Sequence, residues 1–313
     1  MTSEGARPTV TPRLALWIEA LRAPFITASA VPVLVGGALA FWATGNFLLE
    51  RFLLCLGGVV CLHLGANLAN DYFDYVTGCD AANPEPTPFS GGSRMIQRGL
   101  ISARATMAAS AAFFALGAVQ GIALELSVPG HAVTWLGLAG LAGGLLYSAT
   151  PAKLSYRGVG ELVIFALFGP LAVVGTYLCQ TDGLALLPLV VSVPLGLQVT
   201  AVLLVNEVLD VRWDGLAGKR TMVVRLGERR GYALYLGVYL AAYAWLAAGA
   251  VAGVYSRAAL VALVPAVIFL KDLLPARALR DRGATINASR LTVLSHTISG
   301  CLVTATYLVS RLM

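Results

Sequence analysis

Charged side chains are scarce in this chain, since only 12% of its 313 residues are Asp, Glu, Lys or Arg, about half the share found in water-soluble domains. Cysteine is scarce as well, with five residues scattered along the sequence, which excludes a small disulfide-stabilised scaffold. What is abundant is apolar sequence: 58% of the residues are hydrophobic and the mean hydropathy is +0.78. The composition excludes a disordered chain and a coiled coil, and predicts an all-α polytopic membrane protein.

Long apolar segments divide the chain. A helix needs about 20 apolar residues to cross a bilayer, and nine segments bounded by Gly, Pro or charge predict a bundle of nine transmembrane helices. The predicted spans are 24–45, 50–73, 104–125, 132–149, 159–180, 184–209, 231–252, 257–274 and 290–310. The mixed polar residues before Pro24 do not resemble a cleavable signal peptide. We therefore expect an N-terminal arm, residues 1–23, and one transmembrane domain, residues 24–313.

Basic residues are distributed unevenly among the connections. Nine spans put the two termini on opposite sides of the membrane, and 19 of the 22 Lys and Arg residues lie in the N-terminal arm and the longer loops, leaving Arg51, Arg257 and Arg311 on the other side. Because Lys and Arg are enriched in cytoplasmic loops, the N-terminus and long loops are predicted to be cytoplasmic, in the cell (inner) membrane. This topology explains the net charge of +6 without a nucleic-acid partner.

Two clusters of carboxylates and amides are the most informative residues, because an Asp at the centre of a membrane helix costs about 3 kcal/mol. The first ends the second span and the second ends the sixth span. They contain Asn67, Asn70, Asp71, Asp74 and Asp80, and Asn206, Glu207, Asp210 and Asp214. The four-residue spacings place Asn70 with Asp74, and Asn206 with Asp210 and Asp214, on one helix face each. Under the predicted topology both clusters meet at the cytoplasmic mouth of the bundle.

The chemistry of these clusters predicts a magnesium-diphosphate site. Opposed carboxylates repel one another unless cations lie between them, and Mg²⁺ binds through carboxylates while it holds phosphate oxygens and water. Basic side chains that the anion also requires lie in the adjoining loops: Arg94, Arg98, Lys153, Lys219 and Arg220. Backbone amides of 90–93 are a further candidate contact. His63, His131 and His296 have no second ligand three or four residues away, which argues against a His-metal site.

These motifs resemble those of the UbiA superfamily of intramembrane prenyltransferases. Asn70-Asp-Tyr-Phe-Asp74, together with Asn206, Asp210, Asp214 and the run 217–221, is similar to the paired Asp-rich signatures of that family. Further similar segments cover nearly the whole chain: Leu21–Pro24, Gly91–Arg94, Tyr147–Lys153, Tyr156–Glu161, Phe168–Pro170 and Gly175–Tyr177. Tyr156–Glu161 and Gly175–Tyr177 resemble most the MenA-type branch, which prenylates 1,4-dihydroxy-2-naphthoate for menaquinone. The chain departs from the family at Gly78, where many relatives carry a third Asp, and at Glu207, where many of the branch carry Asn.

The resemblance implies Mg²⁺-dependent transfer of a polyprenyl group from an allylic diphosphate to an aromatic acceptor. It implies catalytic parts for Asp74, Asp210, Lys153 and Tyr147. The implied Mg²⁺ ligands are Asp71, Asp74, Asp80, Asp210 and Asp214. The implied substrate-binding residues are Asn70, Asn206, Arg94, Lys219, Arg220, Tyr156 and Arg22. Tyr147 and Tyr156 are expected to face the allylic cation, and Arg22 or Arg157 the acceptor's carboxylate.

Other functions remain open at this level. Transfer to another aromatic acceptor, such as 4-hydroxybenzoate or homogentisate, agrees with the same motifs. Intramembrane acids also mark ion pathways in secondary transporters, but those acids lie near the midplane, whereas here they gather at one end beside a long polar loop. A non-catalytic membrane scaffold has no need of the acids. The identity of the acceptor, the length of the prenyl chain and the oligomeric state depend on how the helices pack against one another, which the sequence alone does not determine.

Overall fold

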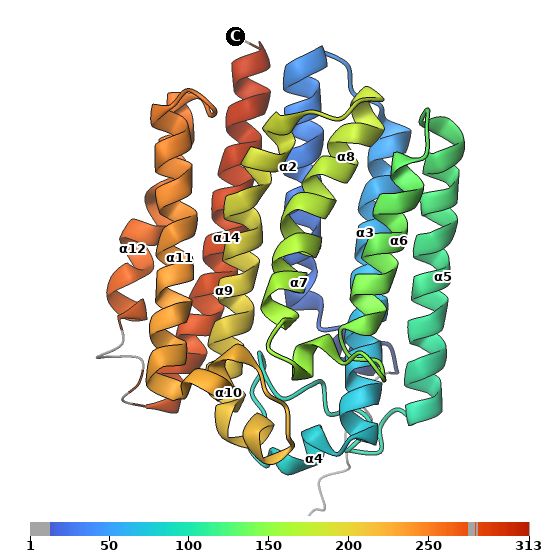
Figure 1. The fold of residues 1–313 in the computed structure, drawn as a ribbon, viewed down its shortest axis with the longest axis vertical. Helices are drawn as coiled ribbons and strands as arrows, with labels where there is room; N and C mark the ends of the chain where they lie inside the picture. Colours follow the sequence, from blue (N-terminus) through green and yellow to red (C-terminus); the bar gives the residue numbers. More distant parts are fainter. Residues whose placement is uncertain (1–12, 275–278, 280, 313) are drawn as a thin grey trace, which may run out of the picture.

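The computed structural model describes residues 13–274, 279 and 281–312, which fold into helices and loops with no strand among them. The all-α prediction is therefore confirmed for the described part of the chain. Within the predicted N-terminal arm the description begins at Arg13. Arg7 in that arm, and Arg277 and Arg280 in the last long loop, lie outside the described residues. Figure 1 shows a bundle of helices that run along the long axis of the molecule.

Within the described residues, nine helical segments coincide with the nine predicted spans, and three of these segments are composite. The first four are η1 (Ala23–Ile26) with α2 (Thr27–Thr44), α3 (Leu49–Val76), α5 (Ala103–Ser127) and α6 (Ala132–Leu146). The fifth joins α7 (Gly160–Ala166), a π-helical turn η3 (Leu167–Leu171) and α8 (Ala172–Thr181). The last four are α9 (Leu186–Leu216), α11 (Glu228–Val251), the 3₁₀ helix η4 (Arg257–Leu263) with α12 (Val264–Leu273), and α14 (Arg282–Leu312).

Short helices that the sequence did not predict lie in the connections. They are α1 (Arg13–Ala20), α4 (Cys79–Ala82), η2 (Leu154–Tyr156) and α10 (Met222–Leu226). The helices α4 and α10 lie at the lower end of the bundle in Figure 1, which we call the loop end. The longest connections gather there.

Seven of the segments in the described residues are long and apolar enough to cross a membrane, which makes the protein an integral membrane protein. The other two are shorter. α6 has 15 residues, and the η4–α12 segment starts with a 3₁₀ turn. The predicted count of nine crossings depends on these two segments crossing the membrane as well.

The helices that carry the acidic clusters extend beyond the predicted spans. α3 continues to Val76 and α9 to Leu216, whereas the apolar pattern ended at residues 73 and 209. Each extension carries acidic residues of its cluster, which keep helical spacing after the continuous apolar sequence stops. Asp74, Asp210 and Asp214 therefore stand on helices.

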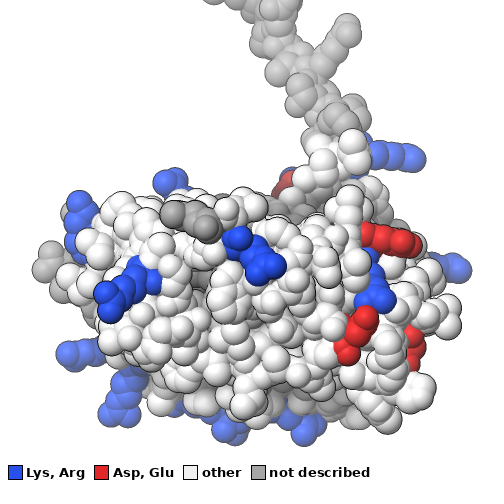
Figure 2. All heavy atoms as spheres, turned by 90° about the horizontal axis from the view of Figure 1, so that it is seen from above, with Lys and Arg blue, Asp and Glu red and all other residues white. Residues whose placement is uncertain are grey.

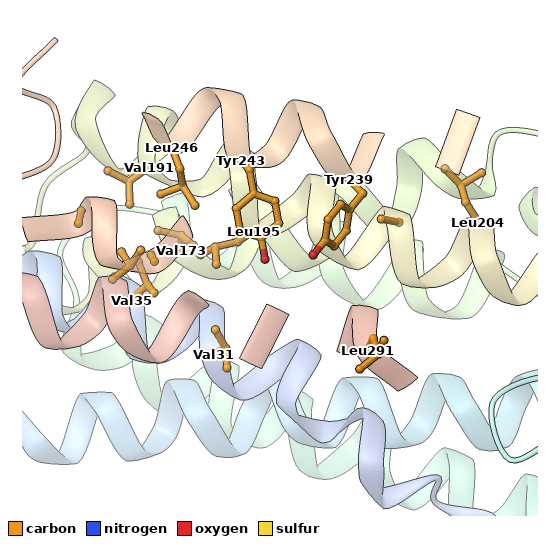
Figure 3. Packing of buried hydrophobic residues seen from close by; sticks show 14 of the residues in the cluster. Val31, Val35, Val173, Val191, Leu195, Leu204, Tyr239, Tyr243, Leu246 and Leu291 are labelled. Atoms are coloured by element: carbon orange, nitrogen blue, oxygen red, sulfur yellow. The ribbon is translucent and has the colours of Figure 1, made fainter. Parts of the chain in front are cut away.

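One side of the bundle, which we call the packed half, consists of α9, α11, η4–α12 and α14 with one face of α2. Its buried side chains interlock closely, as Figure 3 shows for Val31, Leu195, Tyr239 and Tyr243. The buried tyrosines on α11 pair with hydroxyls on α14: Tyr235 with Thr292 at 2.8 Å, Tyr239 with Ser295 at 2.9 Å and Tyr243 with Ser299 at 3.0 Å. Such hydrogen bonds hold helices together where lipid removes the hydrophobic driving force.

The other side, which we call the cavity half, consists of α3, α5, α6 and α7–η3–α8. Its buried apolar residues form smaller clusters, one of them around Cys55, Leu124, Val133 and Leu178. The helices α2 and α9 stand between the two halves and contribute to both.

The end opposite the loop end carries few charges, and Figure 2 shows a face that is mostly uncharged with scattered basic and acidic groups. Arg51 near the start of α3, Arg257 at the start of η4 and Arg311 near the end of α14 belong to this end. Arg51 binds Asp182 at 2.6 Å and the carbonyl of Cys179 at 3.0 Å. The three basic residues that the sequence separates from the rest thus lie at the same end of the bundle.

Candidate functional site

A cavity of about 590 Å³ lies between α2, α3, α5, α6, α7–η3–α8 and α9. Its polar part is at the loop end, and its remainder is lined mainly by apolar side chains and glycines, with a few polar side chains such as Glu125, Thr134 and Thr176 among them. Nine of the predicted site residues line it: Arg22, Asn70, Asp74, Asp80, Tyr147, Asn206, Asp210, Asp214 and Lys219. Five do not: Asp71, Arg94, Lys153, Tyr156 and Arg220.

The first acidic cluster is organised around Asp74, whose side chain is buried. Asn70 lies one turn earlier on α3, and its amide donates to Asp74 Oδ2 at 3.0 Å and to Ser148 Oγ at 3.1 Å. The hydroxyl of Tyr156 donates to Asp74 Oδ1 at 2.7 Å. The shared helix face of Asn70 and Asp74, predicted from their spacing, is confirmed. Tyr156 does not line the cavity, and it contacts the site through the hydrogen bond from its hydroxyl to Asp74.

Asp71 pairs with Arg22, which precedes α2. The guanidinium of Arg22 bonds the Asp71 carboxylate and donates to Asn70 Oδ1 at 3.2 Å. Burial alone would lower the pKa of Arg22, but Asp71 raises it above its ordinary value, so this arginine remains charged at the cavity wall. The other carboxylate oxygen of Asp71 is buried and has no hydrogen-bond partner among the described residues.

The second cluster is held by the loop that follows α4. Asp210 accepts from Asn83 Nδ2 at 3.0 Å and from the backbone N–H of Gly91 at 2.9 Å. Gly91 has φ of 79° and Gly92 of 74°, a backbone conformation that favours glycine, and a Cβ on Gly92 would stand 2.8 Å from Asp80 Oδ2. The sequence indicated the backbone amides of 90–93 as a candidate contact of the diphosphate. In the structure this loop does reach the site, where the amide of Gly91 donates a hydrogen bond to Asp210.

Lys219 joins the two clusters. Its ammonium lies 3.7 Å from Asp74 Oδ2 and 3.6 Å from Asp214 Oδ1, and 5.6 Å from the centre of the Tyr156 ring. Burial would lower the pKa of this lysine, but Asp214 and Asp74 raise it well above its ordinary value. Carboxylates far apart in the sequence therefore meet across one charged group, as the opposed-cluster prediction requires.

Asp80 and Arg94 shape the loop beside these clusters. Asp80 lines the cavity and accepts from Gln97 Nε2 at 2.8 Å. Burial, with Asp74 and Asp71 nearby, raises the pKa of Asp80 to about 7. The guanidinium of Arg94 donates to the carbonyls of Asp80 and Asn83. Arg94 thus supports the loop that carries Asp80 and Asn83, and its guanidinium is engaged outside the cavity.

The remaining predicted basic residues occupy different places. Lys153 lies 5.1 Å from the centre of the Tyr156 ring, behind the cavity wall. Arg220 has an exposed side chain, and its backbone N–H donates to the carbonyl of Tyr156 at 3.1 Å. Arg157 is also exposed and donates to the carbonyl of Pro151 at 2.8 Å. Only Lys219 and Arg22 among the predicted cations line the cavity.

The donor set at the loop end fits a hard divalent cation. Asp74, Asp80, Asp210 and Asp214 line the same part of the cavity, and among the described lining residues Lys219 and Arg22 are the only Lys or Arg side chains that balance their charge. Carboxylate oxygens are the ligands that Mg²⁺ prefers. A diphosphate, itself an anion, needs additional positive charge to bind there. No three His, Cys, Asp or Glu side chains of the described residues are gathered closely enough to form a metal site by themselves. Phosphate oxygens and water are expected to complete the coordination of such an ion.

Two residues of the cavity region were missed at the sequence level. Glu161, buried at the start of α7, accepts from the backbone N–H of Met222 at 2.7 Å and so anchors α10. Glu161 lies within the predicted span 159–180, and a carboxylate inside a membrane span is rare enough to have marked it as a site residue. His63 lines the cavity, although its sequence isolation had argued only against a metal site. It stands seven residues before Asn70, two helical turns on the same face, and this spacing was the available signal.

Comparison with known proteins identifies relatives of this chain. Residues 29–291 match the model of the UbiA prenyltransferase family. The 1,4-dihydroxy-2-naphthoate octaprenyltransferase of Mycobacterium tuberculosis is 33% identical over 228 residues, which cover 72% of this chain and 74% of that protein.

Solved structures have the same fold. The apo structure of a UbiA homolog from Aeropyrum pernix K1 superposes with a TM-score of 0.69 at 20% identity, covering 89% of this chain and 97% of that one. A UbiA homolog from Archaeoglobus fulgidus, bound to GPP and Mg²⁺, superposes with a TM-score of 0.59 at 16% identity, covering 93% of this chain and 99% of that one.

Proposed function

Because this chain belongs to the UbiA prenyltransferase family, we propose that it transfers a polyprenyl group from an allylic diphosphate to 1,4-dihydroxy-2-naphthoate in menaquinone biosynthesis. One observation carries the proposal: two carboxylate clusters converge at one end of a cavity whose remainder is mainly apolar. A polyprenyl diphosphate has the same division, with a charged head and a hydrocarbon tail. The relative from Mycobacterium tuberculosis, which carries the name of that activity, supports the choice of acceptor.

The charged head is assigned to the loop end. Asp74, Asp210 and Asp214, with Asp71 and Asp80, are the proposed ligands of Mg²⁺, and Asn70 and Asn206 orient the substrate beside them. When bound, Mg²⁺ neutralises the charge that develops on the departing diphosphate. The Mg²⁺ of the Archaeoglobus fulgidus homolog supports the same dependence here.

Lys219 is the proposed partner of the diphosphate itself. Its ammonium lies between Asp74 and Asp214 and remains protonated. A fixed positive charge beside the leaving oxygens stabilises them more as the carbon–oxygen bond breaks. Arg22 adds a second positive charge on the cavity wall. Lys153, Arg94 and Arg220 are proposed to contribute through the surrounding field and the loop conformation, because their side chains do not line the cavity.

The apolar part of the cavity suits the tail and the reactive intermediate. An allylic cation is quenched by water, so a dry site favours transfer to the acceptor. Tyr147 lines the cavity, and its ring is proposed to stabilise that cation. Tyr156 acts on Asp74 through its hydroxyl.

The proposed reaction balances without an external base. The carbon–oxygen bond to diphosphate breaks, and a carbon–carbon bond forms between the allylic carbon and the ring carbon that bears the carboxylate. That carboxylate then leaves as carbon dioxide, and its bonding electrons restore the aromatic ring. Arg22 is the proposed partner of the acceptor's carboxylate before it leaves.

We propose that the cavity's polar end opens at the cytoplasmic side of the inner membrane, with nine crossings that include α6 and η4–α12. The few basic residues at the opposite end support this orientation. Cysteines introduced as Ser93→Cys and Gly215→Cys should be labelled by a membrane-impermeant maleimide only in inverted vesicles, and Asp182→Cys only in intact cells stripped of the outer membrane. Labelling of Ser93→Cys and Asp182→Cys from one side would contradict the nine-span topology.

The function is tested with the purified full chain in detergent, geranylgeranyl diphosphate, an aromatic acceptor and Mg²⁺. Mass spectrometry should detect the decarboxylated prenyl product of 1,4-dihydroxy-2-naphthoate, and EDTA should abolish it until Mg²⁺ is restored. A product formed only with 4-hydroxybenzoate or homogentisate would reassign the acceptor. No product with any acceptor, together with uptake of a solute by proteoliposomes, would favour the transporter alternative.

A further inference from the structure

His63 stands on the cavity wall at the border between its polar and apolar parts. On α3 the lining residues run from Asp74 and Asn70 through Asn67 to His63. Beyond His63 the same helix contributes only Leu62, Val59, Gly58, Cys55 and Leu54. His63 is therefore the last strongly hydrogen-bonding side chain that α3 presents along the cavity. Its distance from Asn70 along the helix axis is about 10 Å, because seven residues rise 1.5 Å each.

Two neighbours fix the orientation of the imidazole ring. Nδ1 lies 2.6 Å from Ser29 Oγ on α2, and the ring packs edge to face on Phe168 with centroids 5.0 Å apart. Ser29 and Phe168 also line the cavity. Since Nδ1 is engaged by Ser29, Nε2 is the ring atom left to bind something else, and within 13–274 and the remaining described segments no hydrogen bond to it is found.

The other two histidines show that this arrangement is particular to His63. His131 is exposed and bonds Glu125 at 2.9 Å. His296 is buried in α14 and does not line the cavity. Only His63, of the three, combines a fixed ring with a place on the wall of the substrate cavity.

The chemistry of the two substrates decides which one His63 meets. An imidazole nitrogen that enters an apolar complex without a partner destabilises it. The prenyl tail is a hydrocarbon and offers no polar atom. The diphosphate is assigned to the region of Asn70 and Asp74, which lie about two and three helical turns beyond His63 on α3. The aromatic acceptor is the substrate whose polar groups fall between these regions.

A hydroxyl group is the partner that fits best. The Ser29 contact allows either tautomer of the ring, so Nε2 either donates or accepts. A hydroxyl serves both cases because it is donor and acceptor at once. An ionised carboxylate can bind Nε2 only when Nε2 carries the proton and donates it. The carboxylate of the aromatic substrate also already has a candidate partner in Arg22.

We propose that His63 Nε2 recognises a hydroxyl group of the aromatic acceptor, with Ser29 and Phe168 as the residues that position the ring. The inference rests on the proposed prenyl transfer and adds to it a subsite for the acceptor. It assigns acceptor selectivity to the α2–α3 wall, separate from the carboxylates that take the diphosphate.

The test compares wild type with His63→Phe, which keeps an aromatic ring against Phe168 but removes the hydrogen bond. With geranylgeranyl diphosphate and 1,4-dihydroxy-2-naphthoate, KM for the acceptor should rise about tenfold, as for a lost hydrogen bond whose partner is left unpaired. KM for the diphosphate should stay unchanged. His63→Gln, which retains a hydrogen-bonding group, should recover part of the loss, and Ser29→Ala should give a smaller rise in the same KM.

Non-reacting analogues separate hydrogen bonding from a change of shape. Inhibition constants are measured for 2-naphthoate, 1-hydroxy-2-naphthoate and 4-hydroxy-2-naphthoate. His63→Phe should weaken inhibition by one hydroxylated compound and leave 2-naphthoate unaffected, which also identifies the hydroxyl concerned. His131→Asn, outside the cavity, is the matched control and should change none of these constants.

The outcomes distinguish this inference from the proposed function. Turnover by wild type with an unchanged acceptor KM in His63→Phe would overturn the inference alone. An equal loss of affinity for all three analogues would also overturn it, because that result indicates a change of cavity shape. Wild type that prenylates no aromatic acceptor would overturn the proposed function, and the acceptor subsite with it. Thermal unfolding of each variant checks that it is folded, and Ser29→Ala tests the subsite if His63→Phe is not.

Discussion

In the packed half, the tyrosine hydroxyls of α11 each have a partner: Tyr235, Tyr239 and Tyr243 bond hydroxyls of α14, and Tyr232 bonds the carbonyl of Leu273 at 2.8 Å. Around the cavity, polar side chains of α3, in the cavity half, and of α9, between the two halves, face a space instead of another helix. Polar groups in a membrane must be paired, and the four tyrosine hydroxyls of α11 are paired within the protein itself. The second arrangement leaves polar groups on a cavity wall, where we propose that the substrates and Mg²⁺ bind.

This difference teaches where mutations should act. Substitutions in the packed half should remove stability and leave the chemistry of the folded protein intact. Substitutions at the polar end of the cavity should remove the chemistry and leave the fold intact.

The largest effect is expected for Asp74→Ala and Asp210→Ala, each of which should lower turnover by about a thousandfold, the upper end of the range seen for groups that stabilise transition-state charge. Both side chains lie at the cavity and contribute little apolar packing. Thermal unfolding of the purified variants should stay near that of wild type. Asp182→Ala, at the opposite end, is the matched control and should keep its activity. Turnover near that of wild type in either cavity variant would refute the two-cluster site.

Tyr239→Ala should destabilise the protein by about 3–5 kcal/mol, as for aromatic residues removed from a core, because Tyr239 is buried and its hydroxyl bonds Ser295. The kcat of the fraction that remains folded should be unchanged. Unfolding in increasing SDS measures the stability, and Trp135→Ala, at a side chain 71% exposed on α6, is the control. A loss of kcat at unchanged stability would contradict the division between the halves.

Lys219→Gln should lower kcat about a hundredfold and raise KM for the prenyl diphosphate less, because its charge acts most on the bond that breaks. Arg220→Gln should change neither constant much, since its side chain is exposed outside the cavity. Steady-state kinetics normalised to folded protein provide the comparison. Equal effects of the two substitutions would show that both act only through the general positive charge of the loop.

The smallest effects come from two glycines, one in each half. A Cβ on Gly300 would lie 2.0 Å from Val31 Cγ1, so Gly300→Ala should cost about 1–3 kcal/mol by overpacking. A Cβ on Gly137 meets nothing within 4 Å and the residue lines the cavity. Gly137→Leu should therefore leave stability unchanged and shift preference toward shorter prenyl diphosphates. Competition between geranyl and geranylgeranyl diphosphate measures the preference, and an unchanged ratio would place the tail elsewhere.

Gly137 also shows where expectation and structure differ. Glycines inside a membrane span are in general expected to allow close helix packing, and Gly143 does so, since a Cβ there would lie 2.9 Å from Leu167 Cδ2. Gly137 faces open space instead. The sequence cannot distinguish a glycine that allows a neighbouring helix to approach from a glycine that faces a cavity. Both positions lack a side chain, and they differ only in whether another helix or open space lies next to them.

Local chemistry along the chain was sufficient to predict the long helical segments, though not the short helices of the connections, and the one-face grouping of Asn70 with Asp74. Apolar length and four-residue spacing are properties of a single segment, so no neighbour is needed to interpret them. The resemblance of the motifs to the UbiA family also came from the sequence, and it is confirmed by the family match.

Only the tertiary structure decided which side chains share the cavity. Lys219 and Arg220 are adjacent, yet the first reaches Asp74 and Asp214 while the second faces outward. The cause is the loop backbone, where Gly218 has φ of 73° and the N–H of Lys219 donates to the carbonyl of Asp214. His63 likewise became part of the site only when Ser29 and Phe168 fixed its ring from other helices. Directions of side chains across a bundle depend on contacts between distant segments, which no single segment contains.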